Sequence, residues 1–405
     1  MEVVHSRCAG MDVHKKVVVV CALLGRRQQT RSFGTTTEEL RGLRDWLLSL
    51  GVTDAAMEST GSYWKPVFNL LEESGIDVMV VNAAHVKAVP GRKTDVNDAQ
   101  WLADLLRHGL LRGSFIPDRA HRELRELVRY RRSLMQERGR EVLRIPKVLE
   151  GANIKLASVA SDVMGVSGRS MLDALAAGVE DAAALTALAR GRLKAKHDDL
   201  LRALDGIMGA HQRFLLAEQL RHVDELEARI ERLSEEIARR MLPFEAQLAA
   251  LDEIPGVGLI GAQEIVAETG VDMGRFPSAG HLASWAKVSP GNNESAGKRR
   301  SGRTGKGNPW LRSTLVEAAV ASVRTKNSYL TAQYRRLAAR RGKKRAAMAV
   351  AHSILVIAYH ILRDGVPYRD LGSDFFDRRS KDALAARMKR RLEALGYSVV
   401  IREAA

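Results

Sequence analysis

Four acidic residues near the start of the chain could together bind a metal ion. Asp12 stands in GMDVHKK and Glu58 in AMESTG, each at the end of a run that is typical of a β-strand. Asp95 and Asp98 stand three residues apart in KTDVNDA, where a helix is expected to begin, and such positions share one face of a helix. Ligands of open α/β sheets bind beyond the strand ends, so we expect the four side chains to meet there.

Carboxylates that share one site repel one another, and each resists ionisation unless a cation joins them. Mg²⁺ prefers hard oxygen ligands of this kind and keeps open positions for phosphate oxygens. Two such ions about 4 Å apart can hold the attacking and leaving oxygens of a phosphoryl transfer. The four acids therefore predict a site for one or two Mg²⁺ ions and chemistry on a phosphate ester.

Each acid also has a purely structural interpretation. Asp12 could start a turn between two strands, Glu58 and Asp95 could cap helices, and Asp98 could be a solvated helix charge. For any one of these acids alone, the structural interpretation is the better one. The four together, on the element order of this part of the chain, favour the metal site.

The first 117 residues alternate short strands and helices. Three strands are predicted in RCAGMDV, KVVVVCALLG and QTRSFGT, and apolar residues at helical spacing follow in TTTEELRGLRDWLLSL. The full order is β-β-β-α-β-α-β-α, which predicts an α/β domain. The two cysteines, Cys8 and Cys21, are too few for a disulfide framework or a cysteine-rich zinc site. We expect both as reduced core residues on neighbouring strands.

From residue 118 the pattern becomes helical. Residues 119–147 form a basic amphipathic stretch, and in 212–242 apolar residues recur at steps of three and four. The second pattern suits a coiled coil with a dimer contact, a long antiparallel hairpin, or a helix buried within one subunit. IPGVG, between two helices in 241–270, resembles a helix-hairpin-helix turn, which can bind phosphates without reading sequence. The predicted domains are residues 1–117, 118–245, 246–346 and 347–405.

The chain carries an excess of positive charge. The 405 residues include 64 Lys and Arg and 48 Asp and Glu, which gives a net charge of +16. One basic cluster is RRLAARRGKKR at 335–345. Clustered cations favour a nucleic-acid partner because they release counterions from phosphates. The N-terminus lacks the pattern of a signal peptide, and the apolar run 348–362 is too short to span a bilayer. We expect no membrane contact.

The stretch GNNESAGKRRSGRTGKGN, residues 291–308, combines glycines and basic residues in a composition that predicts a flexible loop. Its glycines would let the backbone approach DNA closely, and its cations would offset phosphate charge. Asn308 and Arg312 are expected to shape the start of the next helix and to contact the DNA backbone, or to be a helix cap and a solvated arginine. The predicted nucleic-acid-binding residues are Lys298, Arg299, Arg300, Arg303, Lys306, Asn308 and Arg312.

The motifs GMDVHKK, AMESTGSYW and KTDVNDA, in this element order, resemble the RuvC-like RNase H fold of the DEDD transposases of bacterial insertion sequences. These transposases are the group described as bridge-RNA-guided serine recombinases. PGNNESAGKRRSGRTGKGNPWLRSTLVEAA resembles their mostly helical C-terminal serine transposase domain, and the resemblance covers nearly the whole chain. It implies that Asp12, Glu58, Asp95 and Asp98 are the catalytic metal ligands.

The resemblance also implies a serine nucleophile, which falls on Ser295 in NESAG. Ser301 and Ser289 are the competitors, and the Ser-x-Gly pattern before basic residues favours Ser295. A serine hydroxyl needs activation, and this segment holds no histidine and Glu294 as its single acid. The family's mechanism would bring metal and serine into one composite site, within or between subunits. Ser295 would form a phosphoserine link to DNA, and strand exchange would follow.

The partners that the resemblance implies are DNA, a guide RNA and further copies of the chain, as a dimer or a tetramer. It places the protein in the bacterial cytoplasm, with the nucleoid. Two other functions remain open on the residues alone. One is a metal-dependent nuclease of Holliday-junction type in which the glycine-rich basic loop only binds DNA. The other is a nucleic-acid-binding protein without catalytic activity.

Overall fold

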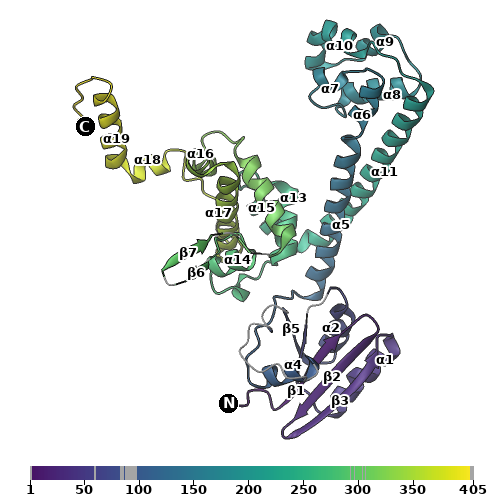
Figure 1. Cartoon of the computed structure of the whole chain (residues 1–405), viewed down its shortest axis with the longest axis vertical. Helices are drawn as coiled ribbons and strands as arrows, with labels where there is room; N and C mark the ends of the chain where they lie inside the picture. Colours follow the sequence, from purple (N-terminus) through teal and green to yellow (C-terminus); the bar gives the residue numbers. More distant parts are fainter. Residues whose placement is uncertain are drawn as a thin grey trace. The chain divides into compact units, whose positions relative to one another are not determined.

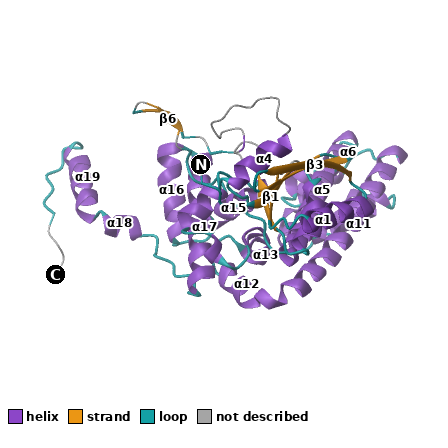
Figure 2. Ribbon diagram, turned by 90° about the horizontal axis from the view of Figure 1, so that it is seen from below, coloured by secondary structure: helices purple, strands orange, loops and turns teal. Residues whose placement is uncertain are grey.

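The computed structural model describes residues 2–58, 61–82, 86, 98–291, 293–295, 297–302, 304–305 and 307–401. Internal contacts divide the chain into two compact units, Met1–Ile116 and Pro117–Ala405 (Figure 1). Figure 2, coloured by secondary structure, shows that most of the chain is helical. The first predicted boundary, at residue 117, lies next to this division. The boundaries at 245 and 346 stay predictions.

The first unit contains a mixed sheet of five strands in the order β3-β2-β1-β4-β5. The first three strands are antiparallel neighbours, whereas β1, β4 and β5 run parallel. The predicted order of strands and helices is confirmed for the described residues. The elements are β1 (Arg7–Val13), β2 (Val17–Leu24), β3 (Arg27–Gly34), α1 (Thr37–Ser49), β4 (Asp54–Glu58), α2 (Trp64–Glu72), β5 (Asp77–Val81) and α4 (Asp98–Arg107).

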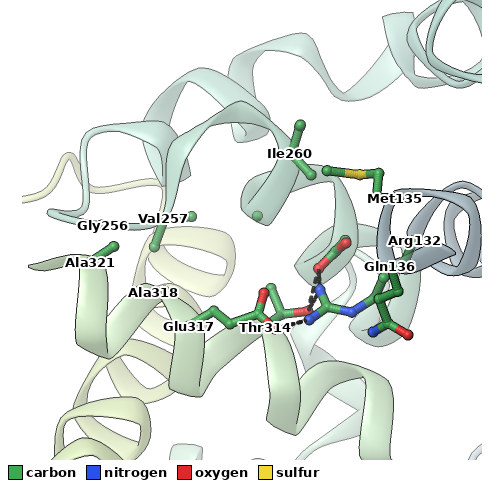
Figure 3. Close-up of a pocket in the computed structure, with 12 residues that line it drawn as sticks. Arg132, Met135, Gln136, Gly256, Val257, Ile260, Thr314, Glu317, Ala318 and Ala321 are labelled. Carbon is green, nitrogen blue, oxygen red and sulfur yellow. Dashed lines mark hydrogen bonds and ion pairs between the residues drawn. The ribbon is translucent and has the colours of Figure 1, made fainter. Parts of the chain in front are cut away.

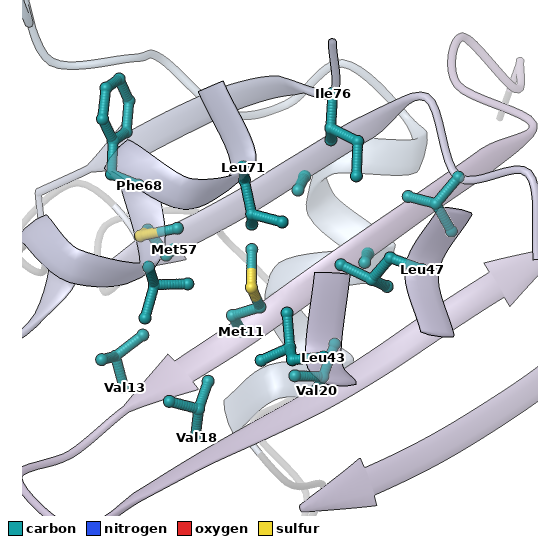
Figure 4. Close-up of a cluster of buried hydrophobic side chains, with 14 of the residues drawn as sticks. Met11, Val13, Val18, Val20, Leu43, Leu47, Met57, Phe68, Leu71 and Ile76 are labelled. Carbon is teal, nitrogen blue, oxygen red and sulfur yellow. The ribbon is translucent and has the colours of Figure 1, made fainter. Parts of the chain in front are cut away.

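Alternate residues of β1 face two different helical layers. Met11 and Val13 belong to the core that α1 and α2 cover, and Met11 lies between Leu43 and Leu71 (Figure 4). Successive strand residues point to opposite faces, so the intervening residues of β1 face α4. The α4 layer is narrower, and its members are Cys8, Cys21, Leu23, Ala56, Ala99, Ala103 and Leu106.

The two cysteines are buried and free, on the neighbouring strands β1 and β2, as predicted. Cys8 Sγ donates a hydrogen bond to the Ala103 carbonyl at 3.7 Å. Burial raises the pKa of the Cys8 thiol to about 12. A thiol that resists ionisation in this way is a core residue and not a nucleophile.

The second unit begins with two long helices that pack side by side, α5 (Arg119–Val142) and α11 (Ala210–Met241) (Figure 1). Ion pairs join Arg138 to Glu227 at 2.5 Å and Arg240 to Glu123 at 3.0 Å. Because the pair that lies later in α5 lies earlier in α11, the two helices run antiparallel. The long-hairpin alternative is therefore correct within one chain, and a contact with a second chain stays a prediction.

Short helices connect the far ends of α5 and α11 around a separate apolar core. Loops between them match the small-residue composition of this part of the sequence. They are α6 (Ile145–Gly151), α7 (Leu156–Val159), α8 (Val166–Ala176), α9 (Ala182–Ala187), the 3₁₀ helix η1 (Gly191–Lys196) and α10 (His197–Leu204).

Helix α17 is the central helix of the remaining chain and contacts α12, α14, α15 and α16. By length and composition it could cross a membrane, but half of its apolar window is buried against its neighbours, as expected of a core helix. The elements are η2 (Leu242–Phe244), α12 (Glu245–Asp252), α13 (Gly258–Thr269), η3 (Met273–Arg275), α14 (Ala279–Trp285), α15 (Pro309–Ser322), α16 (Tyr329–Arg341), α17 (Lys343–Asp364), α18 (Phe375–Arg379) and α19 (Lys381–Glu393).

The stretch 291–308 departs from the prediction of a loop without regular structure. Residues Asn293–Ser295 form β6 and Lys298–Ser301 form β7, which pair as an antiparallel hairpin. Gly297 supplies the turn with a φ of +72°, a conformation that glycine adopts without strain. Composition suggested flexibility, but a glycine at the turn is compatible with a short hairpin.

Candidate functional site

Asp12 and Glu58 lie beside each other at the carboxyl ends of two parallel strands. Met11 of β1 is in register with Met57 of β4, so the next residue on each strand is one of the two acids. Both acids follow the strand alternation onto the face that α4 covers, opposite the face of Met11 and Met57. Each is half-buried.

Asp98 belongs to α4, the helix that covers this face of the sheet. A Cβ atom at Gly10 would lie 2.2 Å from the Ala99 carbonyl oxygen and 2.3 Å from the Ala103 nitrogen. Only glycine allows this approach, which sets the first two turns of α4 against the middle of β1. Asp98 is the first residue of α4, immediately before Ala99. Two of the four predicted acids thus lie at one edge of the sheet, and a third begins the helix that covers the same face.

The side chains of Asp12, Glu58 and Asp98 do not form a metal-binding cluster in this structure. Within the described ranges, no group of three or more Asp, Glu, His or Cys side chains lies close enough to hold one ion. Asp95, the fourth predicted acid, lies outside the described residues. The sequence therefore predicts the elements that carry the acids, and the structure describes three of the four.

His14 is a neighbour of this edge that the sequence analysis did not single out. Its Nε2 atom lies 3.0 Å from Asp12 Oδ2. The signal was present in the alternation Asp-Val-His, because residues two apart in an extended chain point the same way. This contact gives Asp12 a fixed partner on the exposed side of the site.

The hairpin holds Ser295 next to its turn, in register with Lys298. Lys298 is exposed. Arg299 and Arg300 lie on β7. The side chains of Ser295, Arg299 and Arg300 lie outside the description, as do Arg303 and Lys306 altogether.

The chain segments before and after the hairpin lie against each other. A Cβ atom at Gly307 would lie 2.4 Å from Lys287 Cγ, and one at Gly305 would lie 3.3 Å from Lys287 Cδ. Arg312 Nη1 donates to the Gly305 carbonyl at 3.4 Å. We call Lys287, Gly305, Gly307 and Asn308 the hairpin neck. Its two glycines serve close packing and not only flexibility.

Asn308 divides its side chain between two tasks. Its Oδ1 atom accepts hydrogen bonds from the backbone nitrogens of Trp310 at 3.0 Å and Leu311 at 3.2 Å, which caps α15. Its Nδ2 atom donates to Glu268 Oε2 at 2.5 Å. Both polar atoms of this predicted DNA contact are therefore engaged inside the protein, and a DNA contact by Asn308 stays a prediction.

Glu268 is a buried carboxylate on α13, with 1% of the residue exposed. Arg129 binds it with two parallel hydrogen bonds, Nε to Oε1 at 2.7 Å and Nη2 to Oε2 at 2.8 Å. Arg125 lies 3.5 Å from Oε2 and donates to the Ala267 carbonyl at 3.0 Å. Burial lowers the pKa of Arg125 to about 10, although Glu268 opposes that shift.

A second buried ion pair lies further along α5, beside a cavity of about 320 Å³ (Figure 3). Arg132 donates to Glu264 at 2.5 Å and to Ser313 at 3.0 Å, and it pairs with Glu317 at 2.5 Å. Burial raises the pKa of Glu264. Several arginines of the basic stretch 119–147 therefore bind the protein's own acids.

The IPGVG turn joins α12 to α13, as predicted. Gly256 has a φ of +89°, and a Cβ atom there would lie 2.2 Å from the Ala318 carbonyl oxygen and 2.5 Å from the Ser322 nitrogen. This side of the turn is packed on α15. Gly258, Leu259 and Ile260, at the start of α13, are exposed.

Two family models match the chain, one in each half. Residues 9–154 match a model of DEDD transposases of the IS110 group, described as "Transposase". Residues 248–335 match the model described as "Transposase IS116/IS110/IS902 family". The chain belongs to the IS110 family of transposases.

Known relatives agree with the family matches. The transposase for insertion sequence element IS1111A of Coxiella burnetii is 24% identical over 376 residues, which cover 89% of this chain and 90% of that protein. The predicted transposase y4qE of Sinorhizobium fredii is 26% identical over 393 residues, 88% of each chain. A second predicted transposase of that organism, y4pF/y4sB, is 37% identical over 124 residues, which span 29% of this chain and 32% of the relative.

The two matches of this IS110-family transposase include both sets of predicted catalytic residues. The first contains the sheet and all four acids, and it extends into α5 and α6. The second contains Ser295, the hairpin neck and Glu268. The mixed sheet with helices on both faces is consistent with the RNase H-like domain that the sequence predicts.

Proposed function

We propose that this insertion-sequence transposase excises and inserts its element by attack of Ser295 on a DNA phosphodiester, with Mg²⁺ held by Asp12, Glu58, Asp95 and Asp98. The observation that supports the proposal is that Asp12 and Glu58 end neighbouring parallel strands and that α4, which packs on the same face, begins with Asp98. A guide RNA that directs the reaction and assembly into a dimer or tetramer belong to the same proposal.

In the proposed step, Ser295 Oγ forms a bond to phosphorus while the bond from phosphorus to a deoxyribose oxygen breaks. The serine proton passes, in the overall balance, to the leaving oxygen. One phosphate ester replaces another, so strand rejoining by the reverse step needs neither hydrolysis nor an added energy source. Lys298 and the arginines that follow it in the sequence offset phosphate charge.

The donor set fits a hard cation. The three described acids offer only carboxylate oxygens, which suit Mg²⁺ better than a softer metal ion. Mg²⁺ bound there would stabilise negative charge that develops on the scissile phosphate. His14 would hold the Asp12 carboxylate in a fixed orientation through their 3.0 Å contact.

A cationic surface at the turn between α16 and α17 supports binding of the DNA backbone. Seven of the eleven residues from 335 to 345 are basic and all seven are exposed, without an ion pair to an acid in the described part of the chain. Phosphates are the natural partners of such a surface. We call it the α16–α17 basic surface, and its members are Arg335, Arg336, Arg340, Arg341, Lys343, Lys344 and Arg345.

A covalent-trapping experiment tests the proposed reaction. The full chain is incubated with a plasmid that carries both element ends, with RNA transcribed from the element and with Mg²⁺, and is then denatured. We expect a protein–DNA adduct with the wild type and none with S295A, which should keep its DNA affinity because it loses one hydroxyl. Cleavage at the wild-type rate by S295A would instead favour the metal-dependent nuclease.

The D98N variant is the control for the carboxylate site. It removes one charge of the proposed ligand set while it keeps the side-chain shape, so we expect no adduct and unchanged folding. If D98N and S295A both keep the full biological activity of the chain, a nucleic-acid-binding protein without catalysis is the better account.

A further inference from the structure

The serine hairpin depends on its neck for its position. A two-stranded hairpin is marginally stable on its own, and β6 and β7 form a separate sheet of two strands. The chain enters the hairpin after Lys287 and leaves it before Gly305 and Gly307, which pack on the same lysine. Lys287 itself has a φ of +55°, a conformation that costs free energy in a residue other than glycine or asparagine.

Asn308 connects this neck to the interior of the second unit. One end of its amide caps α15, and the other end donates to Glu268. A serine, threonine or aspartate would cap the helix as well. The cap therefore does not explain why the residue also carries an amide donor, whereas the bond to Glu268 does.

Glu268 is held more firmly than a surface carboxylate could be. It is buried, and Arg129 fixes both of its oxygens with a bidentate pair. The Arg129 guanidinium in turn lies 5.8 Å from the centre of the Trp310 ring, in the first turn of α15. Removal of one partner would leave a buried charge unpaired, which is strongly unfavourable.

We propose that Glu268 and Asn308 are positioning residues that fix the serine hairpin to helices α13 and α5. The bond between them sets the place where the chain leaves the hairpin and thereby the place of Ser295, thirteen positions earlier (308 minus 295). This role in catalysis rests on the proposed function. The anchoring itself is a property of the free protein.

The variant N308S separates the two tasks of Asn308. Serine caps a helix about as well as asparagine, but its single hydroxyl cannot both cap α15 and reach Glu268. We expect unchanged DNA affinity, a rate of adduct formation lowered by about 10- to 100-fold as for a nucleophile misplaced by about 1 Å, and faster amide hydrogen exchange in residues 298–301.

A charge-swap pair provides the rescue. N308D keeps the cap but sets two carboxylates against each other, so we expect a larger loss of adduct rate than with N308S. When E268Q is added to N308D, the new amide at 268 can donate to the new carboxylate at 308, and the negative charge near Arg129 moves to residue 308 and is not lost. The double variant should then recover a substantial part of the rate, which a general loss of stability would not produce.

The matched control is D181A, which removes the N-cap of α9 (Ala182–Ala187), away from the neck. It should lower thermal stability by an amount comparable to the loss of one cap and leave the adduct rate unchanged. Wild-type adduct rate and wild-type exchange in N308S would contradict the positioning role and reduce Asn308 to a helix cap.

Failure of this inference and failure of the proposed function give different results. If S295A still forms the adduct, the nucleophile is misassigned, but the exchange of residues 298–301 in N308S still reports on anchoring in the free protein. If S295A abolishes the adduct and N308S changes neither exchange nor rate, the nucleophile stands and the anchoring is refuted.

Discussion

At the scale of single residues, the two candidate sites are defined by close contacts that allow little substitution. Gly10 lets α4 reach β1, and through α4 it determines where Asp98 lies. Gly305 and Gly307 do the same for the hairpin neck. In each case the glycine lies one or a few residues from a candidate functional side chain, so the packing and the proposed chemistry depend on neighbouring positions.

We predict that G10A destabilises the first unit and abolishes adduct formation. The added methyl group would overlap the backbone of α4, and forced overpacking of this kind costs about 1–3 kcal/mol. Urea unfolding followed by circular dichroism measures the loss. G42A is the matched control, because a Cβ atom there would meet nothing within 4 Å. Equal stability of G10A and wild type would contradict the close approach of α4 to β1.

Sequence reasoning reached some of these residues and missed others for a physical reason. The acids stand in short motifs at element ends, so their neighbours along the chain reveal them. Glu268 has no such local signal, because its partners Arg129 and Asn308 are 139 and 40 residues away in the sequence. A buried ion pair between distant segments becomes visible only when the helices are packed.

At the scale of elements, periodicity predicted the helices better than it predicted their partners. The apolar stripe of α11 marks a long buried face, and the ion pairs with α5 identify an antiparallel partner within the same chain. The sequence shows α5 as a basic amphipathic stretch, and in the structure Arg125, Arg129 and Arg132 bind acids of the protein. The positive charge of these α5 arginines is thus partly neutralised by acids within the fold.

The cations that remain exposed should carry the DNA contact. We predict that K343Q/K344Q/R345Q weakens binding of a random duplex by about tenfold at 0.15 M salt and lowers the salt slope of the association constant by about 2–3. Fluorescence anisotropy at several salt concentrations measures both quantities. The control R387Q/R390Q/R391Q removes three exposed cations from α19 and should change neither.

Equal losses in the two triple variants would contradict a specific role for the α16–α17 basic surface, because only total charge would then matter. Weakened binding of a structured RNA with unchanged binding of duplex DNA would assign this surface to RNA instead.

At the scale of the whole molecule, each compact unit carries one half of the predicted chemistry. The first unit contains Asp12, Glu58 and Asp98, and the second contains the hairpin of Ser295 with its neck. The family matches fall on the same two parts in the same order. The division of labour could be predicted from motifs because each motif set is local, whereas the anchoring of the hairpin depends on α5, α13 and α15 together.

The most direct test of the account is to identify the residue that becomes linked to DNA. The trapped adduct is digested with protease and nuclease, and mass spectrometry locates the remaining nucleotide phosphate. We predict that it lies on Ser295, is formed only with Mg²⁺, and is absent from the D98N variant. A nucleotide on Ser301 or Ser289, or an adduct that forms without divalent metal, would contradict the central claim.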